Sequence, residues 1–299
     1  MTTKIIRFKA IVLGMSLGCL VAIGASAEGI RIRPGYAAGD EYAVSLATTT
    51  RTDFRARGDV ARSLDEELEF RYSAHVVVVE IGLDGSPVRE RHEGVELTVV
   101  EKDGPRSLLK KGAALDVVRA EDGAVQIFHG GKPVDPKLAK IVGQLLARQL
   151  EHGVAALVDP GRTVEVGETW QIEGERVQAF MRSRGIQEAK LDGPATATLE
   201  ALPGDRLVVR YRIQMDGFAL GELPSNTHNS RSKAKLEGEV QLESVGVHRP
   251  IGHTSDLALR ITATMKEPGN TRTASWSVRR SESVVQRSET LTDQLASRS

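Results

Sequence analysis

Apolar and polar residues alternate with a period of two along most of the chain. This alternation predicts β-strands that bury only one of their two faces. The pattern begins around Tyr42, Val44 and Leu46, and it returns around residues 207–215, 235–243 and 257–266. Residues 75–79 (HVVVV) are apolar on both faces, which is typical of a central strand covered on two sides.

Turn signals separate several of these strands. Asp-Gly pairs at residues 84–85, 103–104 and 122–123 predict tight hairpins between neighbouring strands. The segment 51–62 is rich in charges and contains Gly58, so we expect a loop or a long hairpin tip there.

A period of 3.6 residues predicts one amphipathic helix over residues 136–152. Asp135 is a good N-cap, Pro136 suits the first helical position, and Gly153 follows His152 as a stop signal. One apolar stripe contains Leu138, Ile141, Val142, Leu145, Leu146 and Leu150. The opposite face carries Lys137, Lys140, Gln144, Arg148 and Glu151, which we expect to be exposed.

These elements predict a mainly β fold. We expect a large curved antiparallel sheet, or an open half-barrel, with the one amphipathic helix packed on its concave face. Residues 28–39 are interpreted as a flexible lead-in, 40–287 as a single domain, and 288–299 as a polar tail.

The N-terminus has the order of a secretory signal peptide. A basic start is followed by an apolar run over residues 10–24 and by Ala25-Ser26-Ala27, which predicts cleavage before Glu28. The run is shorter than the roughly 20 residues of a bilayer-spanning helix. We therefore expect a soluble periplasmic or extracellular protein, with an uncleaved anchor or lipidation at Cys19 as the alternatives.

Composition removes several classes of chemistry. The 299 residues carry 40 Lys and Arg against 40 Asp and Glu, so charge gives no case for binding nucleic acid. Cys19 is the only cysteine, so the chain without its signal has no disulfide and no thiol nucleophile. No G-x-S-x-G, G-x-G-x-x-G or Walker A motif occurs, and we expect neither an enzyme nor a cofactor.

Two clusters come nearest to a chemical site. His248 and His253, with Asp256 nearby, have a spacing that could bring two rings together, but the sequence supplies no complete ligand set, and no metal is expected. Glu67 and Glu69 share a strand face with Arg71, which favours an exposed ion-pair ladder over paired catalytic carboxylates.

Three segments carry a resemblance to a known group of proteins. They are residues 39–42 (GDEY), 159–170 and 236–240. Together they resemble uncharacterised exported bacterial β-rich proteins of the domain-of-unknown-function type, in which a P-x-x-x-V-x-V-G-x-x-W stretch follows the central helix. The matching positions are Pro160, Val164, Val166, Gly167 and Trp170. The resemblance implies a cell-envelope location. The expected architecture also resembles the LolA-like half-barrels that carry lipids and lipoproteins.

Two functions follow as hypotheses. The first is a non-enzymatic binding protein that encloses an apolar ligand or acyl chain between helix and sheet. The candidate contacts are Leu138, Ile141, Val142, Leu145, Leu146, Leu236, Leu259 and Ile261. The second is a structural or interaction module that binds another envelope protein and has a filled core. A lined apolar cavity favours the first, and a filled core favours the second.

Overall fold

The computed structural model describes residues 29–32, 36–57, 62–83, 86–120, 125–146, 148, 153–204, 206–220, 227–242, 250–266 and 273–290. The signal peptide, Cys19, His248 and most of the polar tail lie outside the described residues. Within the expected lead-in, Ile30 and Arg31 form a short strand that pairs with residues 163–164.

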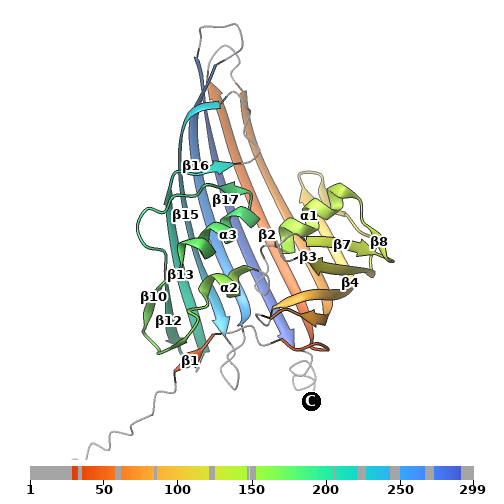
Figure 1. The fold of residues 1–299 in the computed structure, drawn as a ribbon. Coiled ribbons are helices and arrows are strands. Elements are labelled where there is room, and N and C mark those ends of the chain that lie inside the picture. Colours follow the sequence, from red (N-terminus) through yellow and green to blue (C-terminus); the bar gives the residue numbers. More distant parts are fainter. Residues whose placement is uncertain are drawn as a thin grey trace, which may run out of the picture.

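The described residues form three helices and a series of strands (Figure 1). The helices are α1 (Pro136–Leu146), α2 (Ala155–Val158) and α3 (Gly174–Ser183). The strands are β1 (Ile30–Arg31), β2 (Glu41–Arg57), β3 (Arg62–Ile81), β4 (Pro87–Glu101), β5 (Gly104–Ser107), β6 (Ala113–Arg119), β7 (Val125–His129), β8 (Lys132–Pro133), β9 (Thr163–Val164), β10 (Thr169–Gln171), β11 (Ile186–Gln187), β12 (Thr196–Leu202), β13 (Arg206–Asp216), β14 (Ala219–Leu220), β15 (Thr227–Leu242), β16 (Pro250–Lys266) and β17 (Thr273–Thr290).

One 13-stranded antiparallel sheet dominates the molecule, as the alternation predicted. Its order is β10-β12-β13-β15-β16-β17-β2-β3-β4-β6-β7-β8, with β5 paired to β4. Among the described residues the two end strands, β10 and β8, do not pair with each other, so the sheet is open. The C-terminal strand β17 pairs with β2, which places both ends of the domain's sequence at the middle of the sheet.

The predicted hairpin pairings are confirmed, and residues 51–57 take the second of their two predicted forms. β3 with β4, β4 with β5, and β6 with β7 pair antiparallel on either side of the three Asp-Gly pairs, of which residues 84–85 and 122–123 lie outside the described residues. Residues 51–57, expected to form a loop or a long hairpin tip, are the far end of the long β2–β3 hairpin. Residues 51–56 pair in continuous register with β3, and residues 51–57 with β17. Charged residues fit there because one face of this long hairpin is exposed to solvent.

The predicted start of the helix at Pro136 is confirmed, but the described helix ends well before residue 152, and two further helices are present. The Asp135 carboxylate accepts hydrogen bonds from the backbone N–H groups of Lys137 (2.9 Å) and Leu138 (3.3 Å), as an N-cap does. The described helix ends at Leu146, and Arg148 lies in a turn where its side chain is buried rather than exposed. α2 and α3 were not expected, although Val177, Phe180 and Met181 have helical spacing and are buried.

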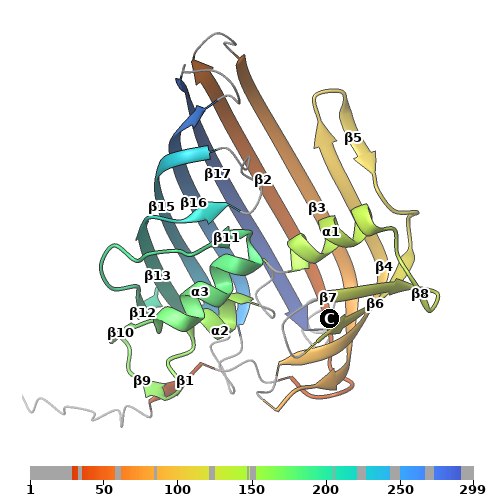
Figure 2. The ribbon, with the colours of Figure 1, turned by 45° about the horizontal axis from the view of Figure 1, so that its top comes forward.

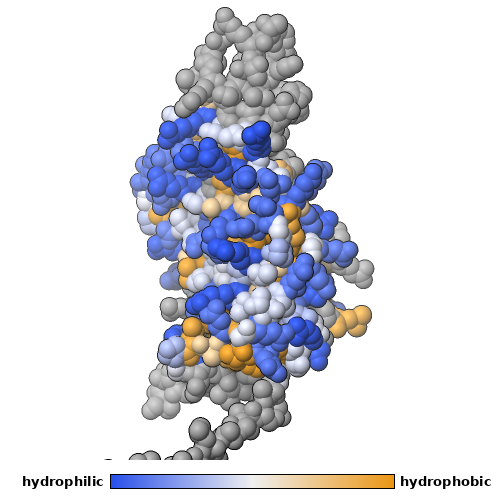
Figure 3. All heavy atoms as spheres, turned by 90° about the vertical axis from the view of Figure 1, so that its left-hand side faces the viewer, coloured by the Kyte–Doolittle hydropathy of each residue, from blue (hydrophilic) through white to orange (hydrophobic). Residues whose placement is uncertain are grey.

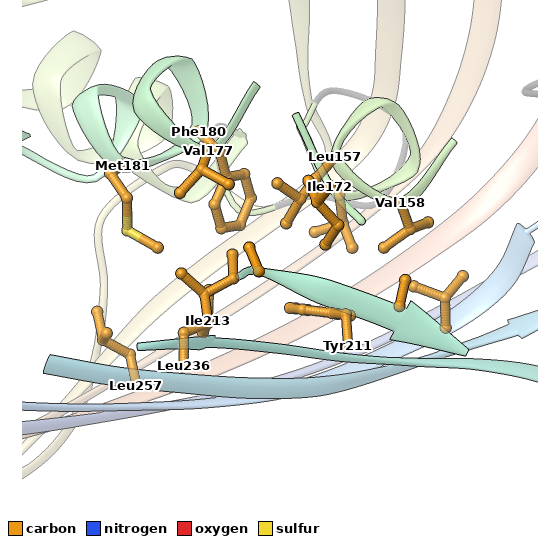
Figure 4. Packing of buried hydrophobic residues seen from close by; sticks show 14 of the residues in the cluster. Leu157, Val158, Ile172, Val177, Phe180, Met181, Tyr211, Ile213, Leu236 and Leu257 are labelled. Atoms are coloured by element: carbon orange, nitrogen blue, oxygen red, sulfur yellow. The ribbon is translucent and has the colours of Figure 1, made fainter. Parts of the chain in front are cut away.

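All three helices lie on the same side of the sheet (Figures 1 and 2). Two apolar clusters fill the space between them and the strands. The first cluster joins α2 and α3 to β12, β13, β15 and β16, and Figure 4 shows Met181, Val177 and Phe180 pointing toward Ile213 and Leu236. The second joins α1 to β2, β3, β4, β6 and β7. We call the helix-covered side the inner face and the opposite side the outer face.

The outer face is polar and laced with ion pairs. Arg212 contacts Glu237 (2.6 Å), and Arg210 contacts both Glu200 (2.6 Å) and Glu239 (3.2 Å). The predicted ladder on β3 is present, with Arg71 2.5 Å from Glu69. Seen from the left-hand side of Figure 1, the surface is mostly hydrophilic, and apolar residues reach it only in small groups (Figure 3).

Candidate functional site: the inner face of the sheet

The residues predicted to contact a ligand all lie on the inner side, but in two different places. Leu236, Leu259 and Ile261 belong to the first apolar cluster. Val142, Leu145 and Leu146 belong to the second, where Leu138 and Ile141 pack at its margin. The six residues named as cluster members are at most 5% exposed, so where the helices cover the sheet these side chains contact one another.

The far end of the β2–β3 hairpin differs from the covered part. The even-numbered residues of both β2 and β3 point their side chains to the inner face. Among them, Phe54 on β2 pairs directly with Leu64 on β3. Leu64 is 51% exposed, while Leu68, Phe70 and Phe54 are half-buried. These four residues form an apolar strip, which we call the distal strip. Phe54 packs at the margin of the first cluster and Phe70 at the margin of the second, so the strip continues from the core and is most exposed at Leu64. In Figure 2 the upper parts of β2 and β3 rise clear of all three helices.

A buried ion-pair cluster lies between the two apolar clusters. Glu282 on β17 is 2% exposed and accepts two hydrogen bonds from Arg148, at 2.9 Å and 2.7 Å. Arg184, just after α3, donates a third at 2.9 Å and stacks over the Phe180 ring, with 4.5 Å between its Cζ and the ring centroid. One carboxylate thus fixes the segments that follow α1 and α3 to the central strand.

His253, a candidate metal ligand in the sequence, is buried beside this cluster. Its Nε2 lies 2.8 Å from the Tyr211 hydroxyl, and its side chain faces inward at 1% exposure. Burial, and then the positive charge of Arg184, lower the pKa of His253 to about 3, so the ring is neutral at pH 7. Burial raises the pKa of Tyr211 to about 12. Both groups are therefore uncharged and share one hydrogen bond, while Nδ1 of His253 is buried without a partner among the described residues.

The Tyr211 ring explains a glycine in the next strand. Gly238 on β15 pairs directly with Tyr211, and a Cβ at Gly238 would collide with the tyrosine hydroxyl. A glycine here leaves room for the ring to lie across the neighbouring strand and reach His253.

A second polar network lies inside the other half of the core. The Tyr42 hydroxyl donates to Glu90 at 2.7 Å, Glu90 lies 3.4 Å from Nε2 of His92, and Nδ1 of His92 is 2.5 Å from the Tyr72 hydroxyl. All four side chains are at most 3% exposed. Burial, together with the charge of Glu90, raises the pKa of Tyr72. The order Tyr–His–Glu resembles a catalytic relay, but all four side chains are buried within the second half of the core.

The two clusters singled out in the sequence are only partly tested, because His248 lies outside the described residues. No group of three His, Cys, Asp or Glu side chains is close enough to hold an ion among those residues. Glu67 and Glu69 are on the outer face, where Glu67 is exposed at the edge of a shallow hollow and Glu69 is half-buried and paired with Arg71. None of the described helices has the length and apolar character needed to cross a membrane.

Sequence reasoning missed the buried polar clusters because their members are far apart along the chain. Arg148, Arg184 and Glu282 come from three separate segments. A signal was available on the strands: Glu90, His92 and Glu282 occupy inward-pointing positions of alternating strands, where an apolar residue would be expected.

Comparison with known proteins gives no family. No family model matches the chain, and no curated protein matches it. Among solved structures, a lipovitellin structure concerned with lipid–protein interactions matches with a TM-score of 0.39 and 9% identity, over 87% of this chain and 26% of lipovitellin. Pseudomonas aeruginosa OccK2 (OpdF), solved with glucuronate, matches with a TM-score of 0.24 and 9% identity, over 87% of this chain and 100% of OccK2.

At these TM-scores the two likenesses carry no argument about ligand or activity. This chain also spans only about a quarter of lipovitellin's length, 26%. The resemblance to LolA-like half-barrels stays a prediction.

Proposed function

We propose that this chain is a non-enzymatic binding protein for a flexible apolar ligand, such as an acyl chain, which lies along the distal strip. The observation that supports the proposal most is the 51% exposure of Leu64 on the face of the sheet that, further along the same strands, is apolar and covered by the helices. Proteins in water keep neighbouring apolar side chains exposed chiefly where they bind something.

The dimensions and chemistry of the strip indicate the kind of ligand. From Leu64 to Phe70 the strand runs about 20 Å at 3.3 Å per residue, which suits an extended chain. Leucine and phenylalanine side chains offer contact area without fixed polar anchors, so they favour a flexible chain over a shaped polar metabolite. Glu66 shares the inner face and is exposed, and its negative charge favours an uncharged acyl ester over a free fatty acid.

Titration with an environment-sensitive, uncharged acyl probe tests this proposal. We expect saturable binding by the full chain, weakened about tenfold in Leu64→Asn/Leu68→Asn because two apolar contacts are lost. Val285→Asn is the matched control, since Val285 is 46% exposed but faces outward. Absence of saturable binding, or an equal effect of the control, would refute the proposal.

The second candidate function is that of a structural or interaction module. The close packing of the two apolar clusters favours this function. Leu46, Val142, Leu146, Leu199 and Leu236 are all at most 1% exposed, as expected when a core serves only stability. This reading predicts no saturable acyl binding, so the same titration separates the two candidates.

Export to the cell envelope is part of the proposal and rests on the signal-like order of residues 1–27. N-terminal sequencing of exported protein should begin at Glu28. A lipid-modified N-terminus at Cys19 would contradict both this cleavage site and the soluble location.

A further inference from the structure

We propose that the outer face carries a second binding site, for a compact polyanion bearing phosphate or sulfate groups. Its centre is Lys233, Arg260 and Arg279, on the neighbouring strands β15, β16 and β17. The site is on the opposite side of the sheet from the distal strip and does not depend on the inner-face ligand.

The strand register brings these three cations into one row. Lys233 pairs directly with Arg260, and Arg260 pairs directly with Arg279. Directly opposed residues on one face of a sheet have Cβ atoms about 5 Å apart, and like charges at that distance destabilise the pairing. The chain is neutral overall, with 40 basic and 40 acidic residues, so this local excess is not a consequence of general composition.

A hollow of about 610 Å³ lies over this row. Its floor includes Ala258 and Ser281, which pair directly with each other and present short side chains. Lys235 pairs with Ala258 from one side, and Arg51 pairs with Ser281 from the other. The volume falls within the range of about 300–1,000 Å³ that is usual for small-molecule sites.

The charges of this hollow are less compensated than those elsewhere on the same face. Within the described residues no carboxylate lies within ion-pair distance of Arg260 or Arg279, and Lys233 is 4.0 Å from Asp216. Two carboxylates, Asp53 and Asp192, also line the hollow. Asp53 pairs directly with Arg279 across β2 and β17, but its carboxylate contacts Arg55 at 3.1 Å. Asp216 pairs directly with Lys233 at the other end of the row, so Arg260, at its centre, has only cations as direct neighbours.

Arg210 and Arg212 show the contrast. They are exposed on β13, also on the outer face, and both are matched with glutamates at 2.6 Å. Among the described residues, the sheet pairs Arg210 and Arg212 closely with glutamates, whereas Arg260 and Arg279 lie side by side without an ion pair and Lys233 has only the 4.0 Å contact to Asp216. This arrangement is suited to an anion supplied from outside.

The chemistry of the row selects the ligand class. Guanidinium groups present planar pairs of N–H donors that match the oxygens of phosphate and sulfate. Strands are about 4.8 Å apart, so neighbouring arginines can engage adjacent oxyanion groups of one ligand. A ligand with several such groups would also remove the repulsion within the row.

Calorimetric titration of the full chain with inorganic tripolyphosphate tests the site. We expect binding that weakens with added salt, and a loss of affinity of about tenfold or more in Arg260→Gln/Arg279→Gln. Arg210→Gln/Arg212→Gln removes the same charge from the same face and should leave the affinity within about twofold. In the absence of ligand, the first variant should keep or raise the thermal midpoint, because it removes repulsion.

Flotation with vesicles distinguishes the source of the anion. Binding to phosphatidylglycerol vesicles, but not to phosphatidylcholine vesicles, with loss in Arg260→Gln/Arg279→Gln, would identify a lipid headgroup. Tripolyphosphate binding without vesicle binding would identify a soluble ligand. The proposal is overturned if the wild-type chain binds neither probe, or if both double variants lose binding equally.

Discussion

The two ends of the β2–β3 hairpin have the same side-chain pattern and opposite surroundings. At the covered end, Leu46 pairs with Tyr72, and each side chain is 1% exposed. At the far end, Phe54 pairs with Leu64 on the same face, and Leu64 is 51% exposed. The two pairs are about 26 Å apart along the strands, at 3.3 Å per residue.

The difference shows that strand patterning fixes which face is apolar but not whether that face is covered. Whether the apolar face is covered depends on where the helices lie. The segments that follow α1 and α3 are fixed to the sheet by the ion pairs of Arg148 and Arg184 with Glu282. We infer that the covered end provides stability and the far end provides binding.

The largest effect should come from breaking the link that holds the cover in place. Glu282→Gln leaves two arginines buried without their carboxylate, and removing one partner of a buried ion pair typically costs about 3–5 kcal/mol. Denaturant unfolding checks this. Glu237→Gln is the control, because its ion pairs with Lys235 and Arg212 are exposed and should contribute at most about 1 kcal/mol. Equal losses in the two variants would mean that Glu282 does not hold the helices.

Truncating an apolar side chain should lower the unfolding free energy much more at the covered end of the inner face than at the far end. Leu145→Ala removes a side chain that is 3% exposed and should cost about 2–5 kcal/mol of unfolding free energy. Leu64→Ala, at the far end, should stay within about 1 kcal/mol. If Leu64→Ala destabilised the protein as much as Leu145→Ala, the distal strip would be part of the core and not a binding surface.

Acidification should weaken the covered end through His253. Its pKa is about 3 when folded and near 6.5 in the unfolded chain, so the unfolded state binds the extra proton between these values. Stability should therefore fall as the pH drops from about 6.5 toward about 3, by up to about 1.4 kcal/mol per pH unit.

Thermal unfolding at pH 6.5 and pH 5 measures this loss above the range where most carboxylates titrate. His253→Gln should reduce the difference between the two pH values, whereas His129→Gln, at an exposed histidine, should leave it unchanged. An unchanged slope in His253→Gln would assign the acid sensitivity to other groups.

The long strands could be predicted because each carries its own evidence. Alternation along residues 207–215 and 257–266 is a local property, and the Asp-Gly pairs mark the turns. α3 has only ten residues and a largely polar sequence, so its three buried positions, Val177, Phe180 and Met181, gave a weak periodic signal.

The candidate sites could not be predicted, because they depend on register and on chain direction. Arg148 was assigned to an exposed helix face by extending the helix past Leu146, whereas the chain turns there and directs the side chain to Glu282. The row of Lys233, Arg260 and Arg279 exists only once three strands are aligned. The exposure of Leu64 depends on where the helices end, which no residue near Leu64 specifies.

Photo-crosslinking with an uncharged acyl chain that carries a diazirine tests the central claim most directly. The full chain is labelled, digested and mapped by mass spectrometry, with unlabelled ligand as competitor. We predict competed labelling concentrated in the peptides that contain Phe54 and residues 64–70, with none in those that contain Leu145 or Val285. Competed labelling of α1 or of the outer face, or no competed labelling at all, would contradict the assignment of the distal strip as the binding surface.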